Sequence, residues 1–321
     1  MSIHTGDQRV YRLTVMNKKI RIGTRDSQLA VWQATLVQDQ LQRNGYETEL
    51  VYIKSEGDTD LVTPLYEIGV QGIFTRTLDA ALLSDKVDIA VHSMKDVPTI
   101  PAKGIVQAAV LKRASYKDIF VPKTGAELLD EYMSVAVVAT SSIRRRAQWL
   151  NRYPLHTIEN LRGNVNTRLR KVADNDWYGA IFAAAGLERI DLRPANAIDL
   201  EWMLPAPAQG AIMIVCKEGD EYCLEACGKL NDEHTALCTK IERDFLRALM
   251  GGCSTPISAL AQVQMGMVEL VGNILTPDGK QKKEVHMYAP LPDAEKLGAE
   301  AAAELLKDGG KEILEQVRNG Q

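Results

Sequence analysis

Hydrophobic and polar positions along the N-terminal part of the chain predict strands and helices in turn. Residues 19–24 alternate like a strand, and the segment from Leu29 to Leu41 keeps its apolar residues at helical spacing. The pattern then predicts a strand at 47–53, a helix with one apolar face at 74–82 and a short buried strand at 89–91. Elements in this order are typical of a largely parallel sheet joined by right-handed crossovers.

A similar layout begins again near residue 118. A strand is predicted at 135–139, and the hydroxyl residues 140–142 then open a helix, as Ser27 does after the first strand. The other elements predicted for this half are strands at 119–122, 155–158, 180–185 and 211–215 and a helix near 126–132. We therefore expect an α/β architecture of two similar lobes, with the proline-rich bend at 204–210 returning the chain to the first lobe.

The pattern changes after residue 231. A helix is predicted at 235–250, and a glycine-rich break at 251–256 ends it. Strands at 257–264, 268–275 and 283–288 and a last helix at 293–316 predict a small antiparallel α+β domain. The expected division is an extension at 1–16, lobe 1 at 17–114 and 211–231, lobe 2 at 115–210 and a C-terminal domain at 232–321.

Composition restricts the possible functions. The 321 residues carry a net charge of −4, which argues against a general binder of nucleic acid or of membrane surfaces. No apolar run approaches the roughly 20 residues that span a bilayer, and the N-terminus lacks the apolar block of a secretion signal, so we expect a cytoplasmic protein. The five cysteines do not suggest a disulfide framework, and Cys223 and Cys227 without a histidine-rich partner form a poor zinc signature, so no metal site is predicted.

Polar residues cluster where the predicted strand at 89–91 ends. Lys95 and Asp96 follow it closely, and Pro98 stops regular structure. Because ligands of α/β proteins bind beyond the carboxyl ends of the strands, Lys95 and Asp96 are candidate site residues. The alternative is a surface salt pair that caps the strand.

Arginines recur beside predicted helix starts. Arg25 precedes the helix at Ser27, residues 144–146 are an arginine run at the start of another helix, and Arg162 and Arg168 flank a third start. Helix N-termini and guanidinium groups both attract carboxylates and phosphates, although a solvated charged face is the alternative. Successive helical residues point about 100° apart, so at most two arginines of the run can face one ligand.

Cys253 differs from the other cysteines because it lies in a glycine loop that should leave its sulfur less enclosed. An inert buried thiol is the alternative. No histidine and acid adjoin it in the sequence to make it a hydrolytic nucleophile, but such a thiol can still anchor a covalent group.

Four motifs in this order closely resemble the porphobilinogen deaminase family, also called the hydroxymethylbilane synthases. The motifs are His92-Ser-Met-Lys-Asp-Val-Pro98, Thr140-Ser-Ser-Ile-Arg-Arg145, Leu161-Arg-Gly-Asn-Val165 with Thr167-Arg168, and Glu242-Arg-x-Phe245 leading into Gly251-Gly-Cys-Ser-Thr-Pro256. The resemblance extends from about residue 18 to the C-terminus.

The resemblance implies a transferase that joins four porphobilinogen molecules head to tail into linear hydroxymethylbilane, with release of ammonia, for haem and related tetrapyrroles. It also implies lobes like those of periplasmic binding proteins and a dipyrromethane cofactor held by a thioether to Cys253. It implies Asp96 as the catalytic carboxylate. The implied cofactor-binding residues are Cys253, Lys95, Asp96, Ser142, Arg144, Arg145 and Gly186, and the implied substrate-binding residues are Arg25, Ser27, Arg162, Arg168, Arg189 and Gln209.

The residue types suit this chemistry. Loss of ammonia from an aminomethylpyrrole leaves an azafulvenium cation, which a fixed carboxylate such as Asp96 can stabilise while it moves protons. Each added ring brings two carboxylates, and arginines remain charged and bind carboxylates in bidentate fashion. The implied partner is the small molecule porphobilinogen, and we expect a monomer with no nucleic-acid or membrane partner.

The chain departs from the family pattern at two places. Bacterial members usually have Gly-Gly-Lys-Gly-Leu-Phe where this chain has Gly69-Val-Gln-Gly-Ile-Phe74, so the predicted lid at 54–72 lacks one cation and Gln71 would offer only hydrogen bonds. Ala208 stands where a glycine is usual. The alternative from another class is a non-catalytic two-lobed anion-binding protein, which explains the arginines but not the loop of Cys253.

Overall fold

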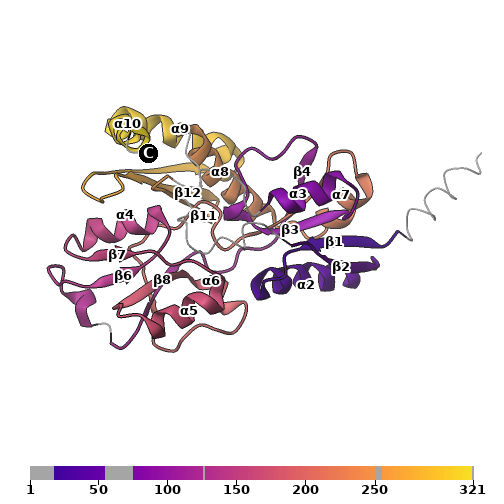
Figure 1. Ribbon diagram of the computed structural model, residues 1–321. Helices are drawn as coiled ribbons and strands as arrows, with labels where there is room; N and C mark the ends of the chain where they lie inside the picture. The colour runs from indigo at the N-terminus through magenta and orange to yellow at the C-terminus, as the bar shows by residue number, and fades with distance from the viewer. Residues whose placement is uncertain (1–17, 55–74, 126, 250–254, 320–321) are drawn as a thin grey trace, which may run out of the picture.

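The computed structural model describes residues 18–54, 75–125, 127–249 and 255–319. Within these ranges the strands form three sheets, each in its own part of the molecule (Figure 1). The predicted extension at 1–16 lies outside the described residues. Among the helices that are described, none is long and apolar enough to cross a membrane.

The first lobe is built on a sheet with the strand order β2-β1-β3-β10-β4. Its strands are β1 (Ile20–Thr24), β2 (Thr48–Tyr52), β3 (Ile89–Ser93), β4 (Ile105–Val110) and β10 (Ile212–Lys217). Its helical elements are α2 (Gln28–Arg43), α3 (Arg76–Leu83), the short turn η2 (Met94–Asp96) and α7 (Glu221–Gly228). Strand β1 pairs in parallel with β2 and β3, whereas β10 runs antiparallel between β3 and β4.

Alternate residues of the central strands point to opposite faces of this sheet and enter separate cores. On β3, Ile89 and Val91 pack with α2 and α7, while Ala90 packs with α3. Helices therefore cover both faces, which explains the near-continuous apolar runs of these strands. The predicted α/β lobe of mainly parallel strands is confirmed.

The second lobe repeats this arrangement, with the strand order β7-β6-β8-β5-β9. Its strands are β5 (Asp118–Pro122), β6 (Val137–Ala139), β7 (Thr157–Glu159), β8 (Gly179–Ala183) and β9 (Ile198–Asp199). Its helical elements are η3 (Glu127–Asp130), α4 (Ile143–Arg152), α5 (Val165–Asp174) and α6 (Ala184–Glu188). Strand β6 is parallel to β7 and β8, and the fourth strand, β5, is antiparallel to both neighbours, as β10 is in lobe 1. The expectation of two similar lobes is confirmed.

The helix predicted near 126–132 is wrong in extent. The described structure has only the single turn η3 there, and Tyr132 and Met133 beyond it are exposed. The apolar side chains beyond this turn are not buried against the sheet, so no tertiary packing stabilises a longer helix there.

The chain passes twice between the lobes. It leaves lobe 1 after β4 and enters lobe 2 at β5, and it returns through the bend at 204–210 to β10 of the first sheet. The predicted boundaries at 114/115 and 210/211 stay a proposal, and they would leave each sheet whole.

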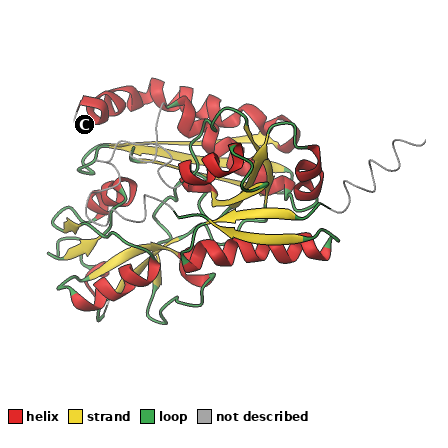
Figure 2. Ribbon diagram, turned by 45° about the vertical axis from the view of Figure 1, so that its right-hand side comes forward, coloured by secondary structure: helices red, strands yellow, loops and turns green. Residues whose placement is uncertain are grey.

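The third sheet is an antiparallel meander in the order β11-β12-β13. Its strands are β11 (Ile257–Gln264), β12 (Met267–Leu275) and β13 (Lys282–Pro290). The helical elements are α8 (Glu233–Ala248), η4 (Leu291–Lys296), α9 (Leu297–Leu305), η5 (Leu306–Gly310) and α10 (Lys311–Asn319). Helices α8, α9 and α10 pack one apolar core against the sheet, which confirms the α+β prediction (Figure 2).

The predicted single helix at 293–316 is wrong, because the chain kinks between α9 and α10. Asp308 and Gly309 leave helical geometry there, and Gly309 has a φ of 92°. Only glycine adopts this left-handed conformation without strain, so the Asp-Gly-Gly sequence ends the first helix and begins the second.

Candidate active site

The turn after β3 carries Lys95 and Asp96. Both side chains are half-buried, and the Lys95 Nζ donates a hydrogen bond to the Gln209 Oε1 at 3.2 Å. Burial lowers the pKa of Lys95 to about 8, helped by the nearby charge of Arg145, while Asp96 acts in the opposite direction. A solvated surface salt pair, the alternative reading of these two residues, does not fit this environment.

A buried aspartate that the sequence analysis did not single out holds the predicted arginine pair. The Asp118 carboxylate is 2.7 Å from the Arg144 Nη2 and 2.7 Å from the Arg145 Nη2, and all three side chains are buried. Burial alone would raise the pKa of Asp118, but Arg144 and Arg145 outweigh it and lower that pKa to about 2. Two arginines of the run therefore face one carboxylate, and Arg146 is only half-buried.

The signal for Asp118 was weak but present. The residue is a lone acid at the first position of a strand, β5, that is buried throughout. An acid in such a place needs a cationic partner, because an unpaired buried charge is costly. The arginines that meet this need begin 26 positions later at Arg144, so sequence proximity could not link them.

Arg162 and Arg168 flank the start of α5, as predicted. Arg162 is buried, and the Arg168 Nε donates to the backbone oxygen of Gly163 at 2.7 Å. Burial, together with the charges of Arg145 and Arg162, lowers the pKa of Arg168 to about 10, and Asp96 opposes this effect. These interactions place the arginines of lobe 2 close enough to Asp96 of lobe 1 for their charges to interact.

Arg25 and Ser27 lie where β1 meets α2 in lobe 1. Ser27 occupies the N-cap position, but its side chain makes no capping hydrogen bond within the described part of the chain. Burial, and secondly the charge of Arg25, lower the pKa of His92 to about 4. His92 belongs to β3, so Arg25 lies near the strand that leads to Asp96.

Arg189 and Gly186 lie at a contact between the lobes. The Arg189 Nη2 donates to the backbone oxygen of Gly210 at 2.7 Å, and its guanidinium lies 5.8 Å from the ring centroid of Trp32 on α2. A methyl group at Gly186 would meet Leu29 of α2 at 3.8 Å. The structure thus engages Arg189 between the lobes, and its role in substrate binding stays a prediction.

Gln209 connects the two lobes through its side chain. It is fully buried, accepts from Lys95, and donates from Nε2 to the Asp118 Oδ1 at 2.9 Å and to the Tyr116 backbone oxygen at 2.8 Å. These contacts fix the orientation of the amide, because its oxygen meets a donor and its nitrogen meets acceptors. Gln209 therefore sets the lysine of one lobe relative to the aspartate of the other.

Helix α8 connects the third domain to the segment at 204–210, where the chain passes between the lobes. The Glu242 carboxylate is fully buried and pairs with the Arg113 guanidinium at 2.5 Å, and the Arg113 Nε donates to the Gln209 backbone oxygen at 2.7 Å. Glu242 also accepts from the backbone N–H groups of Ala208 and Ala261 at 2.6 and 2.8 Å. One carboxylate thus links both lobes and the third sheet.

Cys253 and Gln71 lie outside the described residues, as does the predicted lid except for Lys54. The sequence around Cys253 connects the end of α8 to the start of β11. The role of Cys253 and that of the lid therefore stay predictions.

The described residues of the predicted site carry more positive than negative charge. The basic side chains come from both lobes, and the acids that interact with them include Asp96, Asp118 and Glu188. Such an excess, together with the lowered pKa of Arg168, suits a ligand with several carboxylates. A dipyrromethane cofactor that carries acetate and propionate groups fits this set of residues. The basic residues are Arg25, Lys95, Arg144, Arg145, Arg162, Arg168 and Arg189.

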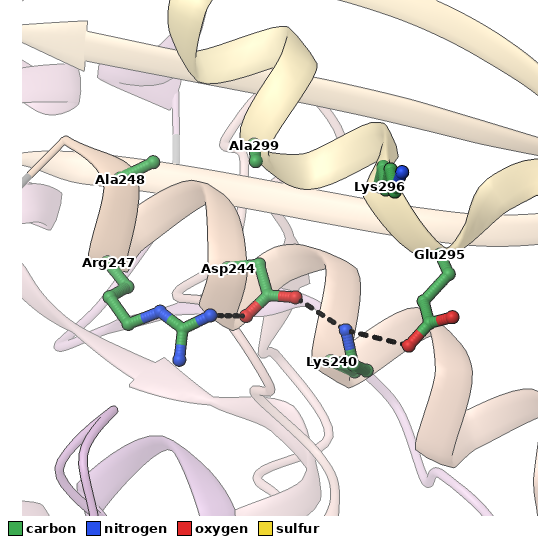
Figure 3. Close-up of a pocket in the computed structure, with 7 residues that line it drawn as sticks. All are labelled: Lys240, Asp244, Arg247, Ala248, Glu295, Lys296 and Ala299. Atoms are coloured by element: carbon green, nitrogen blue, oxygen red, sulfur yellow. Dashed lines mark hydrogen bonds and ion pairs between the residues drawn. The ribbon is translucent and has the colours of Figure 1, made fainter.

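A surface hollow of about 300 Å³ lies elsewhere, between α8 and α9 of the third domain (Figure 3). Asp244 pairs with Lys240 and with Arg247, each at 2.8 Å, and Lys240 also pairs with Glu295 at 3.5 Å. Because the hollow is open and its charges largely compensate one another, it is a poorer candidate than the predicted site with its several arginines. It includes no residue that the sequence analysis selected.

Two family models match the chain. The model described as "Porphobilinogen deaminase, dipyromethane cofactor binding domain" matches residues 20–225. The model described as "Porphobilinogen deaminase, C-terminal domain" matches residues 236–307. Together they extend over both lobes and most of the third domain.

Curated proteins named porphobilinogen deaminase are similar to the chain over nearly their whole length. The protein of Syntrophotalea carbinolica is 40% identical over 299 residues, which cover 92% of this chain and 95% of that protein. The protein of Acidithiobacillus ferrooxidans is 41% identical over 308 residues, which cover 95% of this chain and all of that protein.

Similar solved structures include the periplasmic VFT2 domain of BvgS from Bordetella pertussis. It is 12% identical, covers 72% of this chain and 93% of its own, and gives a TM-score of 0.43. The fold class follows from the strand orders of the three sheets.

Proposed function

The chain belongs to the porphobilinogen deaminase family, and from this premise we propose that the family reaction occurs at the site formed by Asp96 and the basic residues around it. The protein is a transferase, a hydroxymethylbilane synthase, that joins four porphobilinogen molecules into linear hydroxymethylbilane with release of ammonia. The observation that carries the proposal is the pair Lys95 and Asp96 among arginines of the opposite lobe.

The cofactor of this family is a dipyrromethane, and when bound it supplies the primer to which substrate units are added. The proposed attachment point is the Cys253 sulfur. The charge of Arg144 and Arg145, partly balanced by Asp118, suits the carboxylates of such a primer. Each guanidinium has five N–H groups, which is more than its contacts with described residues use.

The proposed role of Asp96 is to stabilise the cation that porphobilinogen forms as it loses ammonia. Lys95 and Arg168 lie close enough to interact electrostatically with the Asp96 carboxylate. A fixed carboxylate beside the pyrrole can stabilise the developing positive charge, and it can also accept and return the pyrrole proton.

The remaining predicted residues would bind substrate and cofactor carboxylates. Hydroxyl, amide and backbone donors add to the arginines at helix starts, where the positive end of the helix dipole favours anions. The proposed set is Lys95, Ser142, Arg144, Arg145 and Gly186 for the cofactor and Arg25, Ser27, Arg162, Arg168, Arg189 and Gln209 for the substrate.

The alternative of a non-catalytic, two-lobed anion-binding protein does not explain the third domain. The match of that domain to the C-terminal family model argues against this alternative. A cytoplasmic location, a monomeric state and the absence of nucleic-acid and membrane partners stay predictions, and sedimentation of the purified protein would check the monomer.

The direct test mixes the purified protein with porphobilinogen and follows ammonia release and bilane formation. Intact mass provides an independent readout, because a covalent dipyrromethane adds mass that should be missing in Cys253→Ser. We expect Asp96→Asn to fold normally, as judged by circular dichroism, and to lose nearly all turnover. Substantial turnover by folded Asp96→Asn would remove Asp96 from the proposed role, and an active protein of unmodified mass would exclude the tethered cofactor.

A further inference from the structure

One arginine of the third domain holds the backbone on both sides of Asp96. The Arg243 Nη1 on α8 donates to the backbone oxygens of Met94 at 3.3 Å and Val97 at 2.8 Å. Its Nη2 donates to the backbone oxygen of Pro98 at 2.6 Å. A single guanidinium therefore binds carbonyl groups that come before and after the proposed catalytic residue.

Within residues 18–54, 75–125, 127–249 and 255–319, few other donors bind these carbonyl groups. The Met94 oxygen also accepts from the Val97 N–H at 3.1 Å, and the Met94 N–H donates to the backbone oxygen of Ala211, just before β10. Pro98 has no N–H and ends the regular pairing of the chain after β3. Charged donors make stronger hydrogen bonds than neutral ones, so Arg243 fixes the path of a turn that no longer belongs to the sheet.

The planar shape of the guanidinium is needed for this contact. Its two terminal nitrogens diverge and reach separate carbonyl groups, whereas a lysine ammonium is a single point. Arg243 also lines a cavity of about 20 Å³ together with Val97 and Pro98, a space no larger than one water molecule. A smaller side chain at position 243 would remove the hydrogen bonds to the three carbonyl groups. It would also enlarge the cavity against which Val97 and Pro98 pack.

Helix α8 also leads directly to the proposed cofactor loop. It ends at Ala248, and Cys253 follows five positions later in the sequence. We propose that Arg243 is a positioning residue for the reaction, which sets the Asp96 carboxylate relative to the helix that precedes the cofactor cysteine. The proposal rests on the proposed function, because it assigns Arg243 an effect only through Asp96.

The test compares Arg243→Met and Arg243→Lys with a matched control, Arg247→Met, on the next turn of the same helix. Arg247 is exposed and pairs with Asp244, so its replacement should leave turnover unchanged. Misplacing a reacting group by about 1 Å can cost roughly 100-fold in rate, so we expect kcat of Arg243→Met to fall about 10- to 100-fold. The KM for porphobilinogen should change less than about threefold, and Arg243→Lys should be intermediate.

A double substitution separates positioning from general damage. In an Asp96→Glu background, where the carboxylate is already displaced, adding Arg243→Met should reduce the rate of the first substrate addition less than about threefold further. The proposal would be overturned if Arg243→Met reduced the rate as much in Asp96→Glu as in the wild-type protein. It would also be overturned if folded Arg243→Met kept the wild-type kcat. Intact mass should show the same Cys253 modification in every variant. Failure of the wild-type protein to release ammonia would instead refute the proposed function.

Discussion

The replacement Asp118→Asn isolates the charge that holds the arginine pair. Asparagine keeps nearly the same shape and can still accept the hydrogen bond from the Gln209 Nε2. It removes the negative charge next to Arg144 and Arg145, which are 5% and 7% exposed. Each arginine keeps one backbone acceptor, the Leu204 oxygen at 2.7 Å and the Ile181 oxygen at 3.1 Å, but the two like charges then face each other without compensation.

Removing one partner from a buried ion pair typically costs about 3–5 kcal/mol, so we expect the free energy of unfolding of Asp118→Asn to fall by about that amount. Urea unfolding followed by far-ultraviolet circular dichroism measures the change. Glu49→Gln is the control, because Glu49 and its partner Lys19 are about half exposed and such pairs contribute about 0–1 kcal/mol.

The same aspartate predicts a loss of stability in acid. Arg144 and Arg145 outweigh burial and lower the pKa of Asp118 from 3.8 to about 2 in the folded protein. Its contribution is therefore complete above about pH 4 and is lost as the pH falls from about 4 to about 2, by roughly 2 kcal/mol. Asp118→Asn should show a shallower loss over this range. The reasoning would be refuted if Asp118→Asn changed the free energy of unfolding by less than about 1 kcal/mol at pH 7 and left its decrease between about pH 4 and about pH 2 unaltered.

Three further changes test other parts of the structure. Asp88→Asn removes a carboxylate whose pKa is held at about 2, against the effect of burial, by hydrogen bonds from Arg21 and Lys18. It should cost about 1–3 kcal/mol at pH 7 and less below about pH 4, measured by urea unfolding at several pH values. Ala208→Gly should raise the free energy of unfolding by up to about 1 kcal/mol, because Ala208 has a φ of 62°, and a lower free energy of unfolding in urea would contradict the inferred strain. Arg162→Leu should leave the protein loaded with fewer substrate units than wild type in intact-mass spectra, and a normal rate of bilane formation would argue against its role in binding carboxylates.

The structure shows the surroundings of Ala208, which stands where the family usually has a glycine. Ala208 is fully buried, and its N–H donates to Glu242 in the crossing between the lobes. An alanine in left-handed geometry costs about 1–2 kcal/mol, which the surrounding contacts must offset. The departure at Gln71 lies outside the described residues.

The sequence by itself determined most elements and the character of the site. Periodicity located the strands and the long helices, because burial of one face leaves a pattern of period two or 3.6 in the chain. Hydroxyl and arginine residues at helix starts indicated an anion site, since local geometry decides where unpaired N–H groups lie. The Asp-Gly-Gly sequence at the kink is also typical of a helix end, although the apolar spacing on either side of it predicts one continuous helix.

Only the tertiary structure decided which distant groups meet. Asp118 pairs with Arg145 across 27 positions and with Gln209 across 91, and Arg243 reaches Met94 across 149. No periodicity records such partners, because each depends on how strands, helices and loops that are far apart in the sequence pack together, within lobe 2 for Asp118 and between the third domain and lobe 1 for Arg243. The sequence therefore indicated that cations would gather around an acid, while the packing selected which acid balances them and which arginine holds the turn of Asp96.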